Sequence, residues 1–381
     1  MKKALSILTV SAMAVSMLAG CGSSNTAATT AAATTAAATE AAKTETAAAT
    51  EAAATEAATE AAKEAAAEAG SADLADKKVG VCIYQFSDNF MTLFRNELQS
   101  YLESLGFKAE NISIVDGAND QATQTNQIQN FITSGVDVLI INPVNSSSAA
   151  TITDMVTAAN IPLVYINREP DEQEEKRWAD ENMNVTYVGC DARQSGTMQG
   201  EIIVDLGQEK VDLNGDGKIQ YIMIEGDPEN VDAQYRTEFS VKALEDAGWT
   251  VDCLDDQVGN WDQATAQQLV ANSLSAHPET EVVFCNNDAM ALGALQSIEA
   301  AGRKVGEDIY LVGVDALTEA LEDVLAGTMT GTVFNDHIAQ SHGAADAAIN
   351  YITGAGNEYY IGCDYVKVTT DNAQSVLDSL K

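Results

Sequence analysis

From Lys78 onward the chain alternates short apolar runs with amphipathic stretches, and this alternation is the feature that most constrains its fold. The apolar runs are rich in β-branched residues, as strands are. The stretches between them carry apolar residues at helical spacing, for example Met91, Phe94 and Leu98. Strands that alternate with helices form parallel sheets covered on both faces. We predict strands at residues 79–84, 112–115, 138–142, 163–167, 185–188, 220–224, 250–254, 282–285, 310–314 and 331–334.

Polar side chains follow most of these apolar runs. In open α/β sheets, ligands bind beyond the carboxyl ends of the strands, so these residues are candidates for a ligand cleft. Asp and Asn at the same positions also cap helices, and capping explains any single one equally well. We expect Asp288 to act mainly as a helix cap. The strand-end residues are Asp88, Asn89, Asp116, Asn142, Asn167, Arg168, Asp191, Glu225, Asp255, Asn287, Asp288, Asp315, Asn335 and Asp336.

A subset of planar polar and aromatic residues near these strand ends suits a sugar. Each sugar hydroxyl both donates and accepts hydrogen bonds, and the C–H faces of a sugar pack on aromatic rings. Plain alternatives remain open: Asp232 and Arg236 are spaced as a surface i,i+4 ion pair, Phe90 lies near an apolar helix face, and Trp261 could pack a loop. The subset is Asp88, Phe90, Asn142, Asp232, Arg236, Trp261, Asn287, Asp315 and Asn335.

The segment from Asp212 to Gln220 has the spacing of a calcium loop. Oxygen donors stand at the first, third, fifth, seventh and ninth positions, with glycine at the sixth for the tight turn. These donors are Asp212, Asn214, Asp216, the Lys218 carbonyl and Gln220. The twelfth position, normally a bidentate Glu, is Met223, so a carboxylate must come from elsewhere. A polar turn without a metal is the alternative.

The N-terminal segment predicts export and a lipid anchor. Lys2 and Lys3 precede an apolar run that ends in Leu18-Ala19-Gly20-Cys21, the pattern of a signal peptide over residues 1–20 whose cleavage exposes a lipidated Cys21. An ordinary secretory signal is the alternative. Residues 21–76 consist largely of Ala, Thr and Glu and predict a low-complexity tether. We therefore expect an extracytoplasmic protein anchored to the cell membrane.

Charge and cysteine usage narrow the possible partners. The formal net charge of −37 argues against nucleic acid as a partner, because binding phosphate needs clustered Lys and Arg.

About 305 residues follow the tether, enough for two domains. The five cysteines beyond Cys21 are scattered and odd in number, which favours buried free thiols over a disulfide framework. They are Cys82, Cys190, Cys253, Cys285 and Cys363.

Residues from about 78 to 374 resemble the type I periplasmic sugar-binding proteins, and within that family the galactose- and glucose-binding branch. The resemblance rests on Asp88-Asn-Phe-Met91, the loop from Asp212 to Gln220, Asn286-Asn-Asp-Ala-Met290, Gly313-Val-Asp-Ala-Leu317 and Asn335-Asp336. It implies an α/β fold of two doubly wound parallel-sheet lobes joined by a hinge. The N-terminal lobe would comprise residues 77–189 and 336–362, and the C-terminal lobe residues 190–335 and 363–381.

The resemblance also implies roles for individual residues. Glu281 would supply the missing calcium carboxylate, and the ion would be structural. The stacking rings would be Phe90 and Trp261, with the remaining members of the sugar subset binding hydroxyls. Asn230 stands where the family has a histidine, which leaves the preferred hexose open.

The function implied is capture of a glucose- or galactose-like monosaccharide by a monomeric lipoprotein and its delivery to the permease of an ABC importer. A sugar sensor for a chemoreceptor or sensor kinase is an alternative, as is a glycosidase that uses cleft carboxylates. No nucleophile elbow, phosphate loop or dinucleotide fingerprint supports an enzyme. A repressor of the same fold would need a DNA-binding segment where the signal and tether stand.

Overall fold

The computed structural model describes residues 74–381. The predicted signal peptide, Cys21 and nearly all of the predicted tether lie outside the described residues. The last three tether residues, 74–76, belong to the folded body, because Leu74 is only 1 % exposed and packs in a hydrophobic core. Among residues 74–381, no helix has the length and apolar character needed to cross a membrane.

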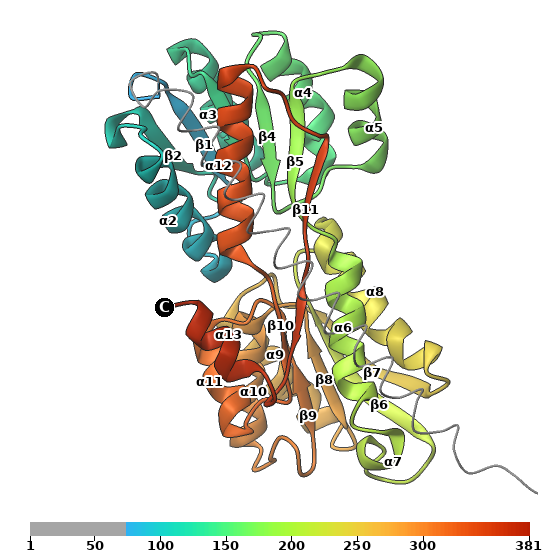
Figure 1. The fold of residues 1–381 in the computed structure, drawn as a ribbon. Coiled ribbons are helices and arrows are strands. Elements are labelled where there is room, and N and C mark those ends of the chain that lie inside the picture. Colours follow the sequence, from blue (N-terminus) through green and yellow to red (C-terminus); the bar gives the residue numbers. More distant parts are fainter. Residues whose placement is uncertain (1–73) are drawn as a thin grey trace, which may run out of the picture. The chain divides into compact units, whose positions relative to one another are not determined.

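The first half of the fold is a six-stranded parallel sheet in the order β11-β5-β4-β3-β1-β2 (Figure 1). Its strands are β1 (Val79–Ile83), β2 (Ile112–Asp116), β3 (Val138–Ile141), β4 (Leu163–Ile166), β5 (Val185–Cys190) and β11 (Tyr360–Cys363). Its helices are α2 (Asn89–Ser104), α3 (Gln121–Ser134), α4 (Ala149–Thr157), α5 (Glu172–Glu181) and α12 (His337–Thr353), with short 3-10 turns η1 (Ala109–Asn111) and η2 (Ser146–Ser148).

The second half is a four-stranded parallel sheet in the order β7-β6-β8-β9, with a separate antiparallel pair β10-β12. The strands are β6 (Lys218–Glu225), β7 (Thr250–Val258), β8 (Val282–Cys285), β9 (Tyr310–Val312), β10 (Thr332–Phe334) and β12 (Val366–Val368). The helices are α6 (Ala192–Val204), α7 (Gln208–Val211), α8 (Val231–Asp246), α9 (Gln263–Ala276), α10 (Asp288–Ala300), α11 (Thr318–Ala326) and α13 (Ala373–Ser379).

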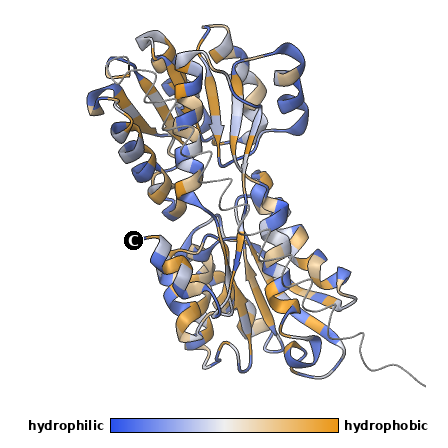
Figure 2. Ribbon diagram, viewed as in Figure 1, coloured by the Kyte–Doolittle hydropathy of each residue, from blue (hydrophilic) through white to orange (hydrophobic). Residues whose placement is uncertain are grey.

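All ten predicted strands are present, and the predicted α/β fold of parallel sheets is confirmed. Strands β1, β3, β4, β5 and β8 are buried along their whole length, as expected for parallel strands covered on both faces. Most strands are accordingly hydrophobic in Figure 2. The expectation of parallel pairing is met only in part by β10. The β10 segment makes isolated parallel bridges to the end of β9 (Val312 with Gly331) and beyond it (Asp315 with Phe334), and its regular ladder is antiparallel, with β12.

The chain passes between the two sheets three times: after β5, between β10 and α12, and between β11 and β12. Of the lobe boundaries implied by the family resemblance, 335/336 lies between β10 and α12, whereas 189/190 and 362/363 lie one residue before the ends of β5 and β11. Strands β5 and β11 are hydrogen-bonded neighbours where they leave the first sheet, since Cys190 is paired in register with Cys363.

Candidate functional site

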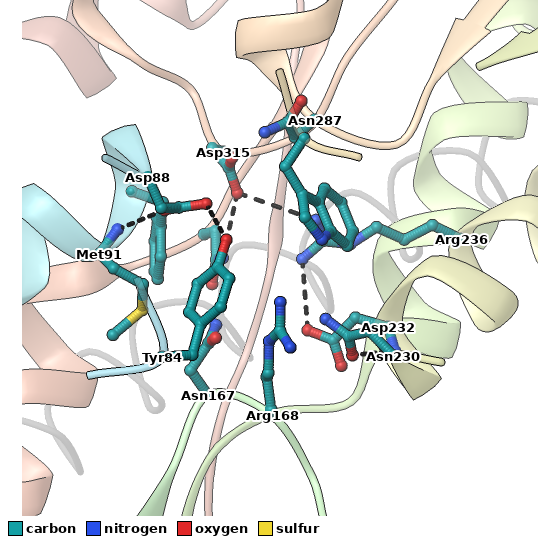
Figure 3. Close-up of a pocket in the computed structure, with 13 residues that line it drawn as sticks. Tyr84, Asp88, Met91, Asn167, Arg168, Asn230, Asp232, Arg236, Asn287 and Asp315 are labelled. Atoms are coloured by element: carbon teal, nitrogen blue, oxygen red, sulfur yellow. Dashed lines mark hydrogen bonds and ion pairs between the residues drawn. The ribbon is translucent and has the colours of Figure 1, made fainter. Parts of the chain in front are cut away.

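A cavity lies between residues of the two halves (Figure 3). It contains nine of the ten predicted sugar-binding residues, which come from six separate stretches of the chain. Four further residues, Tyr84, Met91, Asn167 and Arg168, complete its wall. The predicted members are Asp88, Phe90, Asn230, Asp232, Arg236, Trp261, Asn287, Asp315 and Asn335.

Three of these residues are helix caps and cavity residues at once. The Oδ1 atoms of Asp88, Asn230 and Asn287 accept hydrogen bonds of 2.7, 2.9 and 3.0 Å from first-turn backbone N–H groups of α2, α8 and α10. Each cap uses one side-chain oxygen of its residue. The Nδ2 groups of Asn230 and Asn287 are therefore left to donate to a molecule in the cavity. Capping and ligand binding, treated as alternatives in the sequence, are compatible here.

Asp288 is not the cap of α10, contrary to our expectation, because Asn287 holds that position. The Asp288 side chain is fully buried and points to two other loops. Its Oδ2 accepts the backbone N–H of Leu317 at 2.9 Å, and its Oδ1 accepts the hydroxyl of Thr332 at 2.7 Å. Burial raises the pKa of Asp288 to about 7. This carboxyl group therefore holds together the segments that carry Asp315 and Asn335.

Asp288→Asn is expected to change how stability depends on pH. Because the folded-state pKa is raised, the folded protein binds the proton more tightly, and Asp288 makes the free energy of unfolding fall as pH rises from about 4 to about 7. Asparagine is neutral at every pH, and its amide can accept from Leu317 and donate to Thr332. The variant should gain roughly 2–4 kcal/mol relative to the wild type between pH 4 and pH 8. Urea unfolding at a series of pH values measures this difference, and a difference that does not vary with pH would contradict the assignment.

Arg236 is the central cation of the cavity. It is 3 % exposed, and it donates through Nη1 to the Asn286 carbonyl at 2.9 Å and through Nη2 to the Tyr365 hydroxyl at 3.1 Å. Its guanidinium nitrogens lie 3.7 Å from Asp232 and 3.9 Å from Asp315. The alternative of a surface i,i+4 ion pair between Asp232 and Arg236 is therefore wrong, since both side chains are buried.

The acidic groups beside Arg236 are shifted toward their neutral forms. Burial raises the pKa of Asp232, an effect that Arg236 and Arg168 partly offset. Burial also holds the pKa of Asp315 well above its usual range, again against the opposing effect of Arg236. The cavity thus places guanidinium groups beside carboxyl groups whose negative charge burial disfavours. Such a lining suits an uncharged polar molecule better than an ion.

The predicted sugar-binding set did not include Tyr84 or Arg168, which both line the cavity. Arg168 is 2 % exposed, and its guanidinium carbon lies 3.7 Å from the centroid of the Tyr84 ring. The Tyr84 hydroxyl donates to Oδ2 of Asp88 at 2.7 Å, which fixes the orientation of that carboxylate. Tyr84 was counted within a buried strand, but β1 ends one residue earlier. Asn167 and Arg168 were recognised as strand-end residues, yet nothing in the sequence gave them a partner.

Asn142 is the one predicted sugar-binding residue outside the cavity wall. It is fully buried; its Oδ1 accepts the Tyr84 N–H at 3.2 Å and its Nδ2 donates to Oδ1 of Asn167 at 3.1 Å. Both polar atoms of the Asn142 amide are thus hydrogen-bonded to residues that line the cavity. In this structure Asn142 positions its neighbours.

The two predicted aromatic residues face the cavity in different settings. Phe90 is 6 % exposed and also contacts Phe94, so it serves both the core and the cavity. Trp261 lies in a loop with a left-handed φ of 64° and rests on Gly226, where any Cβ would overlap the indole ring. Asp315 also has a positive φ, 121°. Strained backbone of this kind is concentrated at binding sites, where surrounding structure holds it.

Unsatisfied polar atoms mark the cavity as a place for a ligand. Among the described residues, the buried side-chain atoms without a hydrogen-bond partner include Oδ1 of Asp232, Nε of Arg236 and Nε1 of Trp261. All three residues line this cavity. Because a buried polar group without a partner costs about 1–3 kcal/mol, a polar ligand that reaches these atoms would recover that free energy.

The loop from Asp212 to Gln220 brings its predicted donors together. Asp212 Oδ1 and Oδ2 accept the N–H groups of Gly215 and Gly217 at 2.7 and 2.9 Å. Asn214 donates to Oε1 of Gln220 at 3.0 Å, and Gln220 donates to Oδ2 of Asp216 at 2.7 Å. Lys218 is the first residue of β6, and its side chain pairs with Asp252 in solvent. Hydrogen bonds among the side chains and backbone of the loop thus hold its carboxylate and amide groups close to one another.

Glu281 joins this loop from the start of β8. It is 1 % exposed, and its carboxylate accepts the N–H groups of Leu213, Asn214 and Gln220 at 2.6, 3.3 and 2.9 Å. Burial raises the pKa of Glu281, against the lowering effect of these three bonds. Within residues 74–381, His, Cys, Asp and Glu side chains form no group of three or more placed to hold a metal. The expected donors are three carboxylates, two side-chain amide oxygens and one backbone carbonyl, all of them oxygen ligands of the kind that a hard cation such as calcium prefers.

Comparisons with known proteins agree with this architecture. Residues 79–356 match the periplasmic binding protein domain family. The chain is 35 % identical over 284 residues to the D-galactose/methyl-galactoside binding periplasmic protein of Haemophilus influenzae, covering 74 % of this chain and 83 % of that one. It is 35 % identical over 302 residues to a putative rhizopine-binding protein of Rhizobium meliloti, covering 77 % and 90 %.

Solved structures show the same fold. A solute-binding protein of an ABC transporter from Bacillus halodurans, with bound myo-inositol, superposes with a TM-score of 0.70 at 28 % identity and covers 80 % of this chain and 98 % of its own. The chain therefore belongs to the type I periplasmic sugar-binding proteins. It is an extracytoplasmic solute-binding protein rather than an enzyme, which removes the glycosidase alternative.

Proposed function

We propose that this protein captures a monosaccharide of the glucose or galactose type in the cavity between its halves and delivers it to the permease of an ABC importer. The observation that carries the proposal is the set of three unsatisfied polar atoms, on Asp232, Arg236 and Trp261, around one buried cavity. A hexose offers hydroxyl groups that can accept from the guanidinium and indole N–H groups and donate to the carboxylate. The indole and the Phe90 ring suit its C–H faces.

Contacts between the halves lie beside the cavity. Asn145 donates to Glu229 at 2.9 Å, and Arg168 lies 3.6 Å from Asp227. Residues 145 and 168 follow strands of the first sheet, whereas residues 227 and 229 follow β6 of the second. We infer that these pairs form when the halves close over a sugar by rotation at the crossover segments, as periplasmic binding proteins do. Closure would exclude water and strengthen each hydrogen bond to the sugar.

The preferred sugar depends on groups such as Asn230. Its Oδ1 accepts the Asp232 N–H at 2.9 Å, which fixes the orientation of the amide and leaves its Nδ2 group to donate to the ligand. The relatives named above differ in ligand: galactosides for one, rhizopine for another, myo-inositol in the solved structure. We therefore include cyclitols and pentoses beside the hexoses when testing specificity.

Tryptophan emission provides a test of capture at this cavity. Adding glucose or galactose should change the emission of the wild-type protein, because Trp261 lines the cavity whereas Trp178 is fully buried in a separate core. Trp261→Phe keeps an aromatic ring and should remove the sugar-dependent change while retaining weaker binding. A sugar-dependent change that persists unaltered in Trp261→Phe would place the ligand elsewhere.

We propose that calcium binds the loop from Asp212 to Gln220 together with Glu281. The residues that would hold it are Asp212, Asn214, Asp216, Gln220 and Glu281, with the Lys218 carbonyl. The support is the convergence of these groups and the burial of Glu281 without a cationic partner among the contacts of its carboxylate. A bound ion would neutralise Glu281 and fix the loop at the start of β6. Strand β8 then separates this site from Asn287 by about 20 Å at 3.3 Å per residue.

We propose that Cys21 carries the lipid that anchors the protein to the membrane. The support is the sequence pattern from Lys2 to Cys21, which lies outside the described residues. Cys21→Ser should shift the protein from the membrane fraction to the soluble extracytoplasmic fraction of cells. Retention of Cys21→Ser in the membrane fraction would show that another element holds it there.

A further inference from the structure

Two cysteines terminate the neighbouring strands through which the chain crosses between the halves. Cys190 is the last residue of β5 and Cys363 the last residue of β11, and the two are directly opposite in a parallel ladder. Adjacent strands are about 4.8 Å apart, and residues in register present their side chains on the same face. This separation lies within the Cα–Cα range of disulfides, about 4.4–6.8 Å. Both thiols are free in the structure.

The two thiols differ in how accessible they are to solvent. Cys190 is 3 % exposed and belongs to the core cluster against which Cys363 packs. Contact with the Cys363 thiol, together with burial, raises the pKa of Cys190 well above its usual range. Cys363 is half-buried and lines a surface hollow with Arg193, Tyr360 and Asp364. A reagent in solution therefore reaches Cys363 first.

We propose that Cys190 and Cys363 are a reversible disulfide site that clips β5 to β11 at the crossover. The oxidant is a small-molecule or protein disulfide, R–S–S–R, which an extracytoplasmic protein can meet. The Cys363 thiolate attacks one sulfur of R–S–S–R and releases RS⁻, which takes up a proton. The Cys190 thiol, on losing its proton, attacks the Cys363 sulfur of the mixed disulfide and releases the second thiol. Two protein thiols and R–S–S–R become one protein disulfide and two RSH, so two electrons pass to the external disulfide.

A disulfide at this position would act on segments that are connected to helix α6 and to the cavity. Residue Asp191, which follows Cys190, caps α6, and Tyr365, two residues after Cys363, accepts a hydrogen bond from Arg236 in the cavity. The clip would close a long loop of chain and so restrict the unfolded state. It would also fix two of the three crossover segments relative to each other. This inference does not depend on which solute the cavity binds.

The experiment uses the full chain and hydroxyethyl disulfide, the oxidised form of 2-mercaptoethanol, as the probe. After exposure and alkylation of remaining thiols, a tryptic digest without reductant should contain the peptide of residues 178–193 joined to the peptide of residues 305–367. Dithiothreitol should separate them. Cys253 is exposed and reports that the reagent is active. Modification of Cys253 without the joined peptides would overturn the proposal.

Thermal unfolding distinguishes a clip from an incidental link. The oxidised wild type should melt about 5 °C above the reduced protein. Cys190→Ser and Cys363→Ser should each lose this redox-dependent shift, whereas Cys285→Ser, a buried cysteine in the other sheet, should retain it. The difference in melting temperature between the oxidised and the reduced wild type tests the stabilising role of the disulfide even if a variant folds poorly. Joined peptides with coincident melting of the oxidised and reduced wild type would overturn the stabilising role of the clip.

Discussion

Arg236→Met should lower the affinity for the sugar at least 100-fold. Arg236 is buried, and its Nε lacks a protein partner, so part of its hydrogen-bonding capacity is reserved for the ligand. Hydrogen bonds to a charged group contribute about 1.5–3 kcal/mol each, and 1.4 kcal/mol corresponds to a tenfold change in affinity. Methionine has a similar length but can donate nothing. It would also remove the Arg236 charge from beside Asp232 and Asp315, so the pKa of each carboxyl group should rise further and each should be neutral over a wider pH range.

Arg303→Met is the matched control for this substitution. Arg303 also lies in the second half and contacts Asp308, but it is remote from the residues that line the cavity. Its replacement should leave sugar affinity within twofold of the wild type. Calorimetric titration of both variants measures the effect, with circular dichroism to show that each is folded. Wild-type affinity in a folded Arg236→Met protein would refute the role assigned to Arg236.

Glu281→Ala should lower the free energy of unfolding by about 3–5 kcal/mol, the largest stability effect we expect. The carboxylate accepts three backbone N–H groups while nearly fully buried. Truncation leaves these donors without partners, at about 1–3 kcal/mol for each one that water cannot reach. Glu279→Ala, two residues earlier and exposed, is the control and should change stability by less than about 0.5 kcal/mol.

The same variant tests the calcium proposal. In the wild type, a calcium chelator should lower the melting temperature, because an ion that binds only the folded state stabilises it. In Glu281→Ala the chelator should have little effect, since the loop would have lost the carboxylate that replaces the missing twelfth ligand. If the wild type melts at the same temperature with and without chelator, the calcium proposal is wrong. The structural role of Glu281 would not be affected by that result.

The parts of the fold that sequence predicted are those with strong apolar periodicity. Strands such as β3 and β4 are buried along their whole length and stand out as continuous apolar runs. Strands β11 and β12 were not predicted individually, because both are partly exposed and lack such a run. Helix α7 spans four residues, Gln208–Val211, too few for a periodic pattern to be visible. The antiparallel pairing of β10 depends on β12, which is distant in sequence.

The cysteines show a similar limit. Cys82, Cys190 and Cys285 are buried free thiols as predicted, but Cys253 is exposed and Cys363 half-buried, so the prediction of burial was wrong for these two. Cys253 lies on β7, an edge strand in which every residue is at least partly exposed. An apolar run indicates a strand but does not reveal whether that strand is central or at an edge.

The candidate site was predictable to the extent that strand ends converge at one edge of a sheet. That rule brought Asp88, Asn287 and Asp315 together correctly. It could not separate Asn142, whose amide is used internally, from Asn167, which reaches the cavity. Nor could it reveal that Arg168 stacks on Tyr84, because that contact joins two strands that are not adjacent in sequence. Such assignments depend on side-chain direction, which the sequence pattern does not contain.

Calorimetric titration of the wild-type protein with a panel of monosaccharides tests the central claim most directly. The panel should contain glucose, galactose, ribose and myo-inositol, with Arg236→Met as the control for heat that does not come from the cavity. We predict saturable binding of one sugar molecule per chain for at least one hexose, with that heat absent from Arg236→Met at the same concentrations. A response indistinguishable from buffer for every hexose would contradict the proposed function.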